Sequence, residues 1–206
     1  MQLTRWMLTS ALMALLIGCG GETVEVIDLS KVLDVMVKTF DDMDAKMGSA
    51  FQGNKEDPKV REKYMADFSA KYAENLNNAK LMSKPLGTQV KPDGSIAGFT
   101  DPNKNRQYDS GEPQLFSVEI DMERNRLIAT DTQNGYRRDH GFSMAGGLVA
   151  GMLIGHMLSR QRGAGITGSR FSNMKMNPAN YHGGAVNRAK ASARARSGSG
   201  SFSRGK

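Results

Sequence analysis

Residues 115–130 read LFSVEIDMERNRLIAT, and this stretch decides the fold. Apolar and polar residues alternate from 115 to 120, which is typical of a strand with one buried face. A second such strand is expected at 126–130, and the polar residues 123–125 between the two favour a turn. The stretch therefore predicts two antiparallel strands joined as a hairpin.

A further hairpin is predicted just upstream of this one. Residues 88–91 and 95–99 form its expected strands, and Pro92, Asp93 and Gly94 lie between them. Proline, aspartate and glycine each favour a turn, because proline presets φ, aspartate bonds its own backbone and glycine tolerates positive φ. Residues 87–131 are thus expected to form a small antiparallel meander of three or four strands.

Two helices are predicted before the strands, at about 30–48 and 57–82. The first follows Ser30, a favourable N-cap, and its apolar residues recur at helical spacing: Val32, Leu33, Val35, Met36, Phe40, Met43 and Met47. The second begins at Asp57-Pro58, and its apolar residues follow at steps of four: Val60, Tyr64, Phe68, Tyr72 and Leu76. The two apolar stripes can bury each other as a helical hairpin. Residues 30–134 are therefore expected to form an α+β body, large enough to bury a core.

The segment between the strand pairs, residues 101–112, reads DPNKNRQYDSGE. Its oxygen-bearing side chains follow the ligand spacing of a calcium loop: Asp101, Asn103, Asn105, Gln107, Asp109 and Glu112. Over these twelve residues the chain resembles the EF-hand-like loops of dockerins and of bacterial surface β-domains. Arg106 departs from that pattern, because it stands where such loops have a glycine at a sharp turn. The alternative is a polar connector, since Asp, Asn, Gly and Pro favour turns anyway.

Residues 142–158 read FSMAGGLVAGMLIGHML and carry no formal charge. Gly147, Gly151 and Gly155 repeat every four residues, which places them on one face of a helix and permits close packing, as in GxxxG pairs. A glycine-zipper helix is therefore predicted at 142–159. One interpretation is a membrane-inserted or self-associating helix, although the run is at the lower limit for a membrane span. The other is a buried helix that docks on the body through its glycine face.

The amino terminus predicts export and lipidation. Arg5 precedes an apolar run at residues 6–17, which is as long as a signal-peptide core and short for a membrane span. The run ends in Leu16-Ile17-Gly18-Cys19, which resembles the lipobox of bacterial lipoproteins. The resemblance implies a signal peptide at 1–18, lipid on Cys19 and a tether at 19–29. Gly20 is not the aspartate that retains lipoproteins in the inner membrane, so outer-membrane sorting is implied in a Gram-negative host. The alternative is an ordinary apolar start with an incidental cysteine.

The carboxyl-terminal segment, residues 160–206, carries ten of the 28 basic residues and no acidic residue. The rest of the chain has 18 basic and 21 acidic residues, so the net charge of +7 comes from this segment. Its Gly, Ser, Ala, Asn and Arg content predicts a disordered tail. The charge favours anionic lipid or an anionic envelope polymer, and the alternative is a solubilising tail with no defined partner. Nucleic acid would satisfy the same charge, but export argues against it. Only Phe171, Tyr181 and Phe202 are available there for stacking on bases.

These features favour a lipid-anchored structural or interaction protein of the cell envelope, with a second membrane or homo-oligomer contact. The alternative is a calcium-dependent surface binding module. An enzyme is not expected, because none of the three histidines, at 140, 156 and 182, stands beside a convincing nucleophile or paired acid. The single cysteine excludes an internal disulfide. The layout resembles proteobacterial lipoproteins that combine a lipobox, a glycine-rich apolar segment and a basic Ser/Gly-rich end, a resemblance that implies no particular activity.

Overall fold

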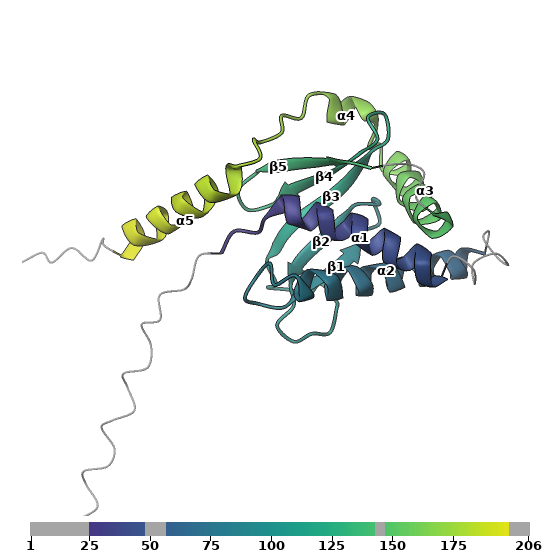
Figure 1. The fold of residues 1–206 in the computed structure, drawn as a ribbon, viewed down its shortest axis with the longest axis horizontal. Helices are drawn as coiled ribbons and strands as arrows, with labels where there is room; N and C mark the ends of the chain where they lie inside the picture. Colours follow the sequence, from purple (N-terminus) through teal and green to yellow (C-terminus); the bar gives the residue numbers. More distant parts are fainter. Residues whose placement is uncertain (1–24, 48–56, 143–146, 198–206) are drawn as a thin grey trace, which may run out of the picture.

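The computed structural model describes residues 25–47, 57–142 and 147–197, and the predicted signal peptide and Cys19 lie outside these ranges. The elements follow one another as α1 (Leu29–Met47), α2 (Pro58–Asn78), β1 (Leu86–Val90), β2 (Ile96–Thr100), β3 (Gln114–Asp121), β4 (Arg126–Asp131), β5 (Arg137–Gly141), α3 (Leu148–Gly163), α4 (Gly168–Ser172) and α5 (Tyr181–Ser197). Helices followed by an antiparallel sheet confirm the predicted α+β class (Figure 1).

The sheet is an antiparallel meander in the order β1-β2-β3-β4-β5. It has one strand more than the sequence pattern predicts, because β5 reads RRDHG and shows no apolar alternation. Polar contacts hold β5 instead. Its Asp139 carboxylate accepts a hydrogen bond from Arg126 of β4 at 2.8 Å. On its other edge, Asn177 accepts from the N–H of Arg137 at 2.7 Å and donates its own N–H to the Arg137 carbonyl.

The main core lies between the sheet and the helices. α1 and α2 run in opposite directions, as predicted, and α1 also contacts β4 and β5, while α2 contacts β1 (Figure 1). Phe40 stacks on Phe68 with ring centroids 4.9 Å apart, and the buried Tyr72 hydroxyl donates to the Val32 carbonyl at 2.9 Å. Gly98 of β2 pairs with Phe116, whose ring occupies the space that a Cβ on Gly98 would need.

A smaller cluster covers the other face of β4. Because side chains alternate along a strand, Leu127 and Ala129 join the main core while Ile128 between them points to the opposite face. Ile166 and Phe171 pack there, and Arg170 pairs with the buried Glu119 at 2.8 Å. The segment around α4 therefore closes a face of the sheet that sequence reasoning left uncovered.

The predicted glycine-zipper helix is α3, and it docks on the body through the face opposite to the one expected. Its apolar residues Val149, Leu153 and Met157 are fully buried, whereas Gly151 and Gly155 are exposed and have nothing within 4 Å of a Cβ placed on them. Branched and long apolar side chains bury more apolar area than glycine, so the fold is more stable when their face of α3 packs on the body. None of the helices in the described ranges is long and apolar enough to cross a membrane.

The prediction of a disordered tail from residue 160 is wrong up to residue 197. α3 extends to Gly163, and α4 and α5 follow it. The prediction from composition failed because a few residues are enough to pack the segment on the body: Ile166, Phe171, Tyr181 and Ala185 are all buried. The tether is also shorter than predicted, since Val26 and Ile27 are already buried in the core. Residues 198–206 lie outside the described ranges.

Candidate functional site

The first half of the 101–112 loop, which joins β2 to β3, is coiled by its own hydrogen bonds. The carboxylate of Asp101, only 3% exposed, accepts the N–H groups of Asn105 at 3.1 Å and Arg106 at 3.0 Å. Asn103 Oδ1 accepts the N–H of Asn105 at 3.1 Å, and Asn105 Oδ1 accepts that of Gln107 at 2.7 Å. These successive side-chain-to-backbone turns wind the chain around the side chain of Asp101.

Arg106 is the residue that breaks the calcium-loop pattern, and its backbone nevertheless follows that pattern. Its φ is +62°, the left-handed conformation that the usual glycine supplies. A residue with a Cβ pays about 1 kcal/mol to adopt this conformation. The hydrogen bond from the Arg106 N–H to Asp101 helps to hold it there.

The second half of the loop does not complete a calcium cage. Asp109 Oδ2 accepts hydrogen bonds from the amides of Asn103 at 2.9 Å and Asn105 at 2.7 Å, and Glu112 bonds to the N–H of Asp109 at 3.0 Å. Within the described ranges, no group of three or more Asp, Glu, His or Cys side chains is placed to hold a metal ion. Calcium would therefore have to displace the two amide donors from Asp109.

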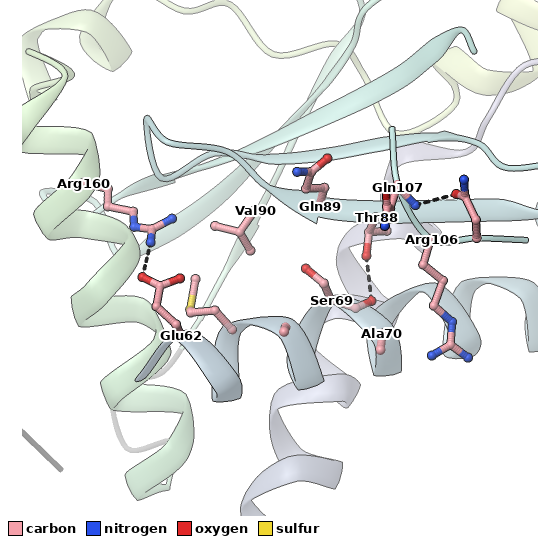
Figure 2. A pocket seen from close by; sticks show the side chains of 12 residues that line it. Glu62, Ser69, Ala70, Thr88, Gln89, Val90, Arg106, Gln107 and Arg160 are labelled. Atoms are coloured by element: carbon pink, nitrogen blue, oxygen red, sulfur yellow. Dashed lines mark hydrogen bonds and ion pairs between the residues drawn. The ribbon is translucent and has the colours of Figure 1, made fainter. Parts of the chain in front are cut away.

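A groove of about 380 Å³ brings this loop together with α2, α3 and β1. Ser69 and Ala70 of α2 lie beside Thr88 and Gln89 of β1 at its floor, where the Thr88 hydroxyl donates to the Ser69 carbonyl at 2.7 Å (Figure 2). Arg160 of α3 lies at one end of the groove, and Arg106 and Gln107 of the loop lie at the other (Figure 2). The structure thus places two features that are distant in sequence, the loop and the glycine-containing helix, around one concave surface.

The wall formed by β1 is the free edge of the sheet. The Pro85 carbonyl accepts the N–H of Asp101, and the N–H of Lys91 donates to the Ser95 carbonyl, each at 2.8 Å. These odd-numbered residues beside the β1 strand bond towards β2, so in an antiparallel ladder the backbone groups of the even-numbered residues point away from the sheet. The side chain of Asn77 bonds both outward groups of Leu86, at 2.9 and 2.8 Å. Among the described residues, nothing bonds the outward backbone groups of Thr88 and Val90. The groove therefore contains a short, unpaired stretch of strand edge.

The α3 end of the groove carries a small charge cluster. The carboxylate of Glu62 accepts a hydrogen bond from Arg160 and lies 3.3 Å from Nε2 of His156. Burial acts to raise the pKa of Glu62, but the hydrogen bonds and charges of Arg160 and His156 outweigh it, so the pKa lies below its usual value. Glu62 is thus held ionised, and it ties α2 to α3.

Each histidine faces a different carboxylate. His140 lies 3.4 Å from Asp34, and His182 lies 4.0 Å from Asp28. In the described part of the chain, no hydrogen bond links a histidine to a serine or threonine hydroxyl. These contacts join α1 to β5 and the residue before α1 to α5.

The first turn of α5 is bonded to the first residue of α1 and to the residues just before it. The hydroxyl of Tyr181 accepts the N–H of Leu29 at 2.7 Å, and Nε2 of His182 lies 2.7 Å from the Val26 carbonyl oxygen. The ring of Tyr181 also packs against that of Tyr136 at 5.4 Å between centroids. Burial raises the pKa of Tyr181 to about 12. Residues 26–29 and the first turn of α5 therefore lie side by side (Figure 1).

Beyond this junction, α5 projects from the body and carries only positive charge. Arg188 and Lys190 are exposed, and no acidic residue follows Asp139 in the sequence. Phe171 and Tyr181 are buried, so neither ring is available to stack on a nucleic-acid base. Of the three predicted stacking residues, only Phe202 is left, and it lies outside the described residues.

Sequence reasoning named the loop and α3 but missed the groove between them and the junction at Tyr181. The groove depends on strand order and helix placement, which no local pattern reports. The junction had one weak signal: Phe171 and Tyr181 are isolated large residues in an otherwise small and polar segment. Aromatic side chains bury a large apolar area when they pack, so these two residues are the natural anchors of the segment.

Comparison with known proteins gives no relative: no family model matches the chain, and no curated protein or solved structure is significantly similar to it. Function can therefore be inferred only from the residues and their geometry.

Proposed function

We propose that the protein is a lipid-anchored component of the bacterial cell envelope, joined to membrane lipid through Cys19, and that α5 binds anionic membrane surfaces. The observation that carries this proposal is the junction at Leu29 and Tyr181, where α5 begins beside the residues that follow the lipobox. Lipid on Cys19 would hold that junction close to a membrane.

The distance from the anchor supports this arrangement. Six residues separate Cys19 from Val26, whose carbonyl contacts His182. Even fully extended, the seven steps from Cys19 to Val26 span at most about 25 Å. α5 has 17 residues, so it is about 25 Å long and can reach a surface at that distance.

The composition of α5 favours binding to the surface over insertion into it. Its larger apolar residues, Tyr181 and Val186, pack on the body, and the remaining exposed positions are small or basic. A basic segment beside an anionic bilayer gains about 1 kcal/mol per Lys or Arg, and salt screens this attraction. The expected binding is therefore electrostatic and reversible.

The anchor is tested by metabolic labelling with palmitate and by fractionation of cells. The wild type should incorporate the label and enter the membrane fraction, whereas Cys19→Ala should not incorporate it. Absence of label in the wild type would overturn the anchor.

The role of α5 is tested with Cys19→Ala protein, so that the lipid does not dominate, by sedimentation with vesicles. Binding is expected to vesicles rich in phosphatidylglycerol, to fall with salt and to be weak with phosphatidylcholine alone. Changing Arg188, Lys190 and Arg194 to Gln should remove most of it. The matched control changes Lys59, Lys80 and Lys104 to Gln, which removes the same charge from exposed positions elsewhere. Equal losses in the two triple variants would show that only net charge matters and would overturn the assignment to α5.

A second candidate function is a calcium-dependent surface binding module. It is favoured by the backbone of the 101–112 loop, in particular by the bonds to Asp101 and the positive φ of Arg106. Arg106 and Gln107 also line the groove, so a cation that reshaped the loop would change the groove's open end.

Isothermal titration with calcium tests this second candidate. Binding in the millimolar range or tighter is expected for the wild type, with a loss of at least ten-fold in Asp101→Ala, while Asp67→Ala on α2 serves as a control with the same charge change. Absence of binding to the wild type at millimolar calcium would exclude the module.

A further inference from the structure

The register of the strands gathers several connections at one end of the sheet. Leu86 pairs with Thr100, so β1 begins opposite the end of β2, and Phe116 pairs with Asp131, so β3 begins opposite the end of β4. Successive strands of an antiparallel meander run in opposite directions, so the connections alternate between its two ends. The segments that share this end are residues 79–85, 101–113 and 132–136.

The chain that leads from Cys19 reaches the body at this same end. The carboxylate of Glu25 accepts the N–H of Ser83 at 2.9 Å and its hydroxyl at 2.8 Å. Two residues further on, the Pro85 carbonyl accepts the N–H of Asp101 at 2.8 Å, where the 101–112 loop begins. The end of the body formed by residues 79–85, 101–113 and 132–136 is therefore called the tether end.

Two attachments would hold the tether end against a membrane. Six steps of chain lead from Cys19 to Glu25, and fully extended they span at most about 22 Å. The basic helix α5 also begins here, because Tyr181 packs on Tyr136 of the β4–β5 connection, with ring centroids 5.4 Å apart. With lipid on Cys19, the tether end is the part of the body nearest to the bilayer.

Tyr108 is the side chain of the tether end best suited to enter a lipid surface. Among the described residues, Tyr108 and Leu148 are the large apolar side chains that stand exposed, at 47% and 39%. The ring of Tyr108 rests on that of the buried Phe99, with centroids 5.1 Å apart, and the hydrogen bonds to Asp101 fix the loop that carries it. Tyrosine is enriched at membrane interfaces, because its ring is apolar and its hydroxyl is polar.

The charge of the loop assigns the contact to this ring and not to ionic attraction. Residues 101–112 carry three acidic and two basic side chains, a net charge of −1, so an anionic surface does not attract them. Entry of the exposed ring into the interface removes apolar area from water. We propose that the tether end faces the membrane and that Tyr108 inserts into the lipid interface. This inference rests on the lipid anchor of the proposed function and adds a contact made by the body itself.

Tyr108→Trp makes this contact measurable by fluorescence. The chain from Cys19 onward has no other tryptophan, because the single one is Trp6. Cys19 is also the single cysteine, so it can be coupled to a maleimide phospholipid in vesicles, which replaces acylation in the cell. On vesicles of phosphatidylglycerol and phosphatidylcholine, the reporter at position 108 should emit at shorter wavelength. Brominated acyl chains should quench it at least two-fold.

Leu148→Trp is the matched control, since it places the reporter at a similarly exposed position far from the tether end. Leu148 begins α3, and the next residue, Val149, bonds to Asp44 of α1. Asp44 lies 15 positions beyond Leu29 in that helix, which corresponds to about 22 Å. The reporter at position 148 should not be quenched. Equal quenching at the two positions, or none at position 108, would overturn the proposal, and stronger quenching at position 148 would assign the membrane contact to α3 instead.

The outcomes separate this inference from the proposed function. Maleimide coupling does not require acylation in the cell, so a failure of palmitate labelling would overturn the anchor and leave this measurement intact. Absence of quenching at position 108 in a protein that takes up palmitate would overturn this inference alone.

Tyr108→Ser decides the question should Tyr108→Trp fail to fold. In uncoupled Cys19→Ala protein, it should lower binding to the same vesicles at least two-fold at every salt concentration, because the lost contact is apolar. Leu148→Ser should leave binding unchanged. Equal effects of the two serine variants would contradict the insertion of Tyr108.

Discussion

The phenolic oxygen of Tyr181 accepts the backbone N–H of Leu29 at 2.7 Å, across 152 positions of the chain. Leu29 is the first residue of α1 and Tyr181 is the first residue of α5. The N–H groups in the first turn of a helix have no partner within that helix, so a side chain from elsewhere must satisfy them when they are buried. This bond is the link between the start of the body and its basic carboxyl-terminal helix.

Tyr181→Phe should lower the free energy of unfolding by about 1–3 kcal/mol, because it leaves the N–H of Leu29 buried and unpaired. Denaturant-induced unfolding measures the loss, and hydrogen exchange should be faster in α5. Tyr108→Phe is the control, since the Tyr108 side chain is 47% exposed. Equal stability of the two variants would contradict the structural role of this bond.

The same residue should give the protein a characteristic response to alkali. Burial raises the pKa of Tyr181 to about 12, whereas a tyrosine in the unfolded chain has a pKa of about 10. The unfolded state therefore loses this proton first as the pH rises. The stability that Tyr181 contributes is fully present below about pH 10 and is lost as the pH rises towards about 12.

Absorbance at 295 nm measures this titration directly. The difference between the wild type and Tyr181→Phe should show one phenol that ionises near pH 12. A phenol that ionises near pH 10 in that difference would mean that α5 is not docked.

The glycines of α3 should respond in opposite ways to substitution by alanine. Gly151→Ala and Gly155→Ala should each stabilise the fold by about 0.5–1 kcal/mol, because both are helical sites with open space around them. Gly147→Ala should destabilise it, because the Asp44 carboxylate occupies the space of the new Cβ. Thermal unfolding of the three variants checks the order, and destabilisation by Gly151→Ala would show that this face is packed.

The predicted second contact through Gly147, Gly151 and Gly155 stays a prediction, and only the last two offer an open face. Leu148 beside them is 39% exposed. Gly151→Leu should weaken membrane association or oligomers without loss of stability. Unchanged fractionation and cross-linking would count against both contacts.

Asp44 of α1 should be required for the docking of α3. Its carboxylate accepts the N–H of Val149 at 2.7 Å and of Ala150 at 3.3 Å, so it acts as the helix cap that Gly147 lacks a side chain to provide. Asp44→Ala should lower the free energy of unfolding by about 1–2 kcal/mol, as loss of a cap does. Asp41→Ala removes the same charge from an exposed position of the same helix and should have little effect. Denaturation midpoints compare the two, and equal values would exclude the capping role.

Much of the fold follows from local patterns in the sequence. The apolar steps in α2 and the alternation in β3 are each dictated by one buried face, so they can be predicted without a structure. β5 could not be predicted this way, because its residues are polar and its place is fixed by partners such as Arg126 and Asn177. The candidate sites divide similarly: the 101–112 loop is a local motif, whereas the groove beside it requires elements that only folding brings together.

The sequence by itself determined the α+β class and the positive charge of the carboxyl-terminal segment, and it predicts lipidation at Cys19, because each of these depends on neighbouring residues. Only the tertiary structure decided where that segment lies, and which face of α3 is buried. A lone anchor such as Tyr181 has no periodicity, so its partner at Leu29 cannot be read from spacing. Long-range packing selects the face that buries the larger apolar area, and for α3 it selected Leu153 and Met157 over the glycines.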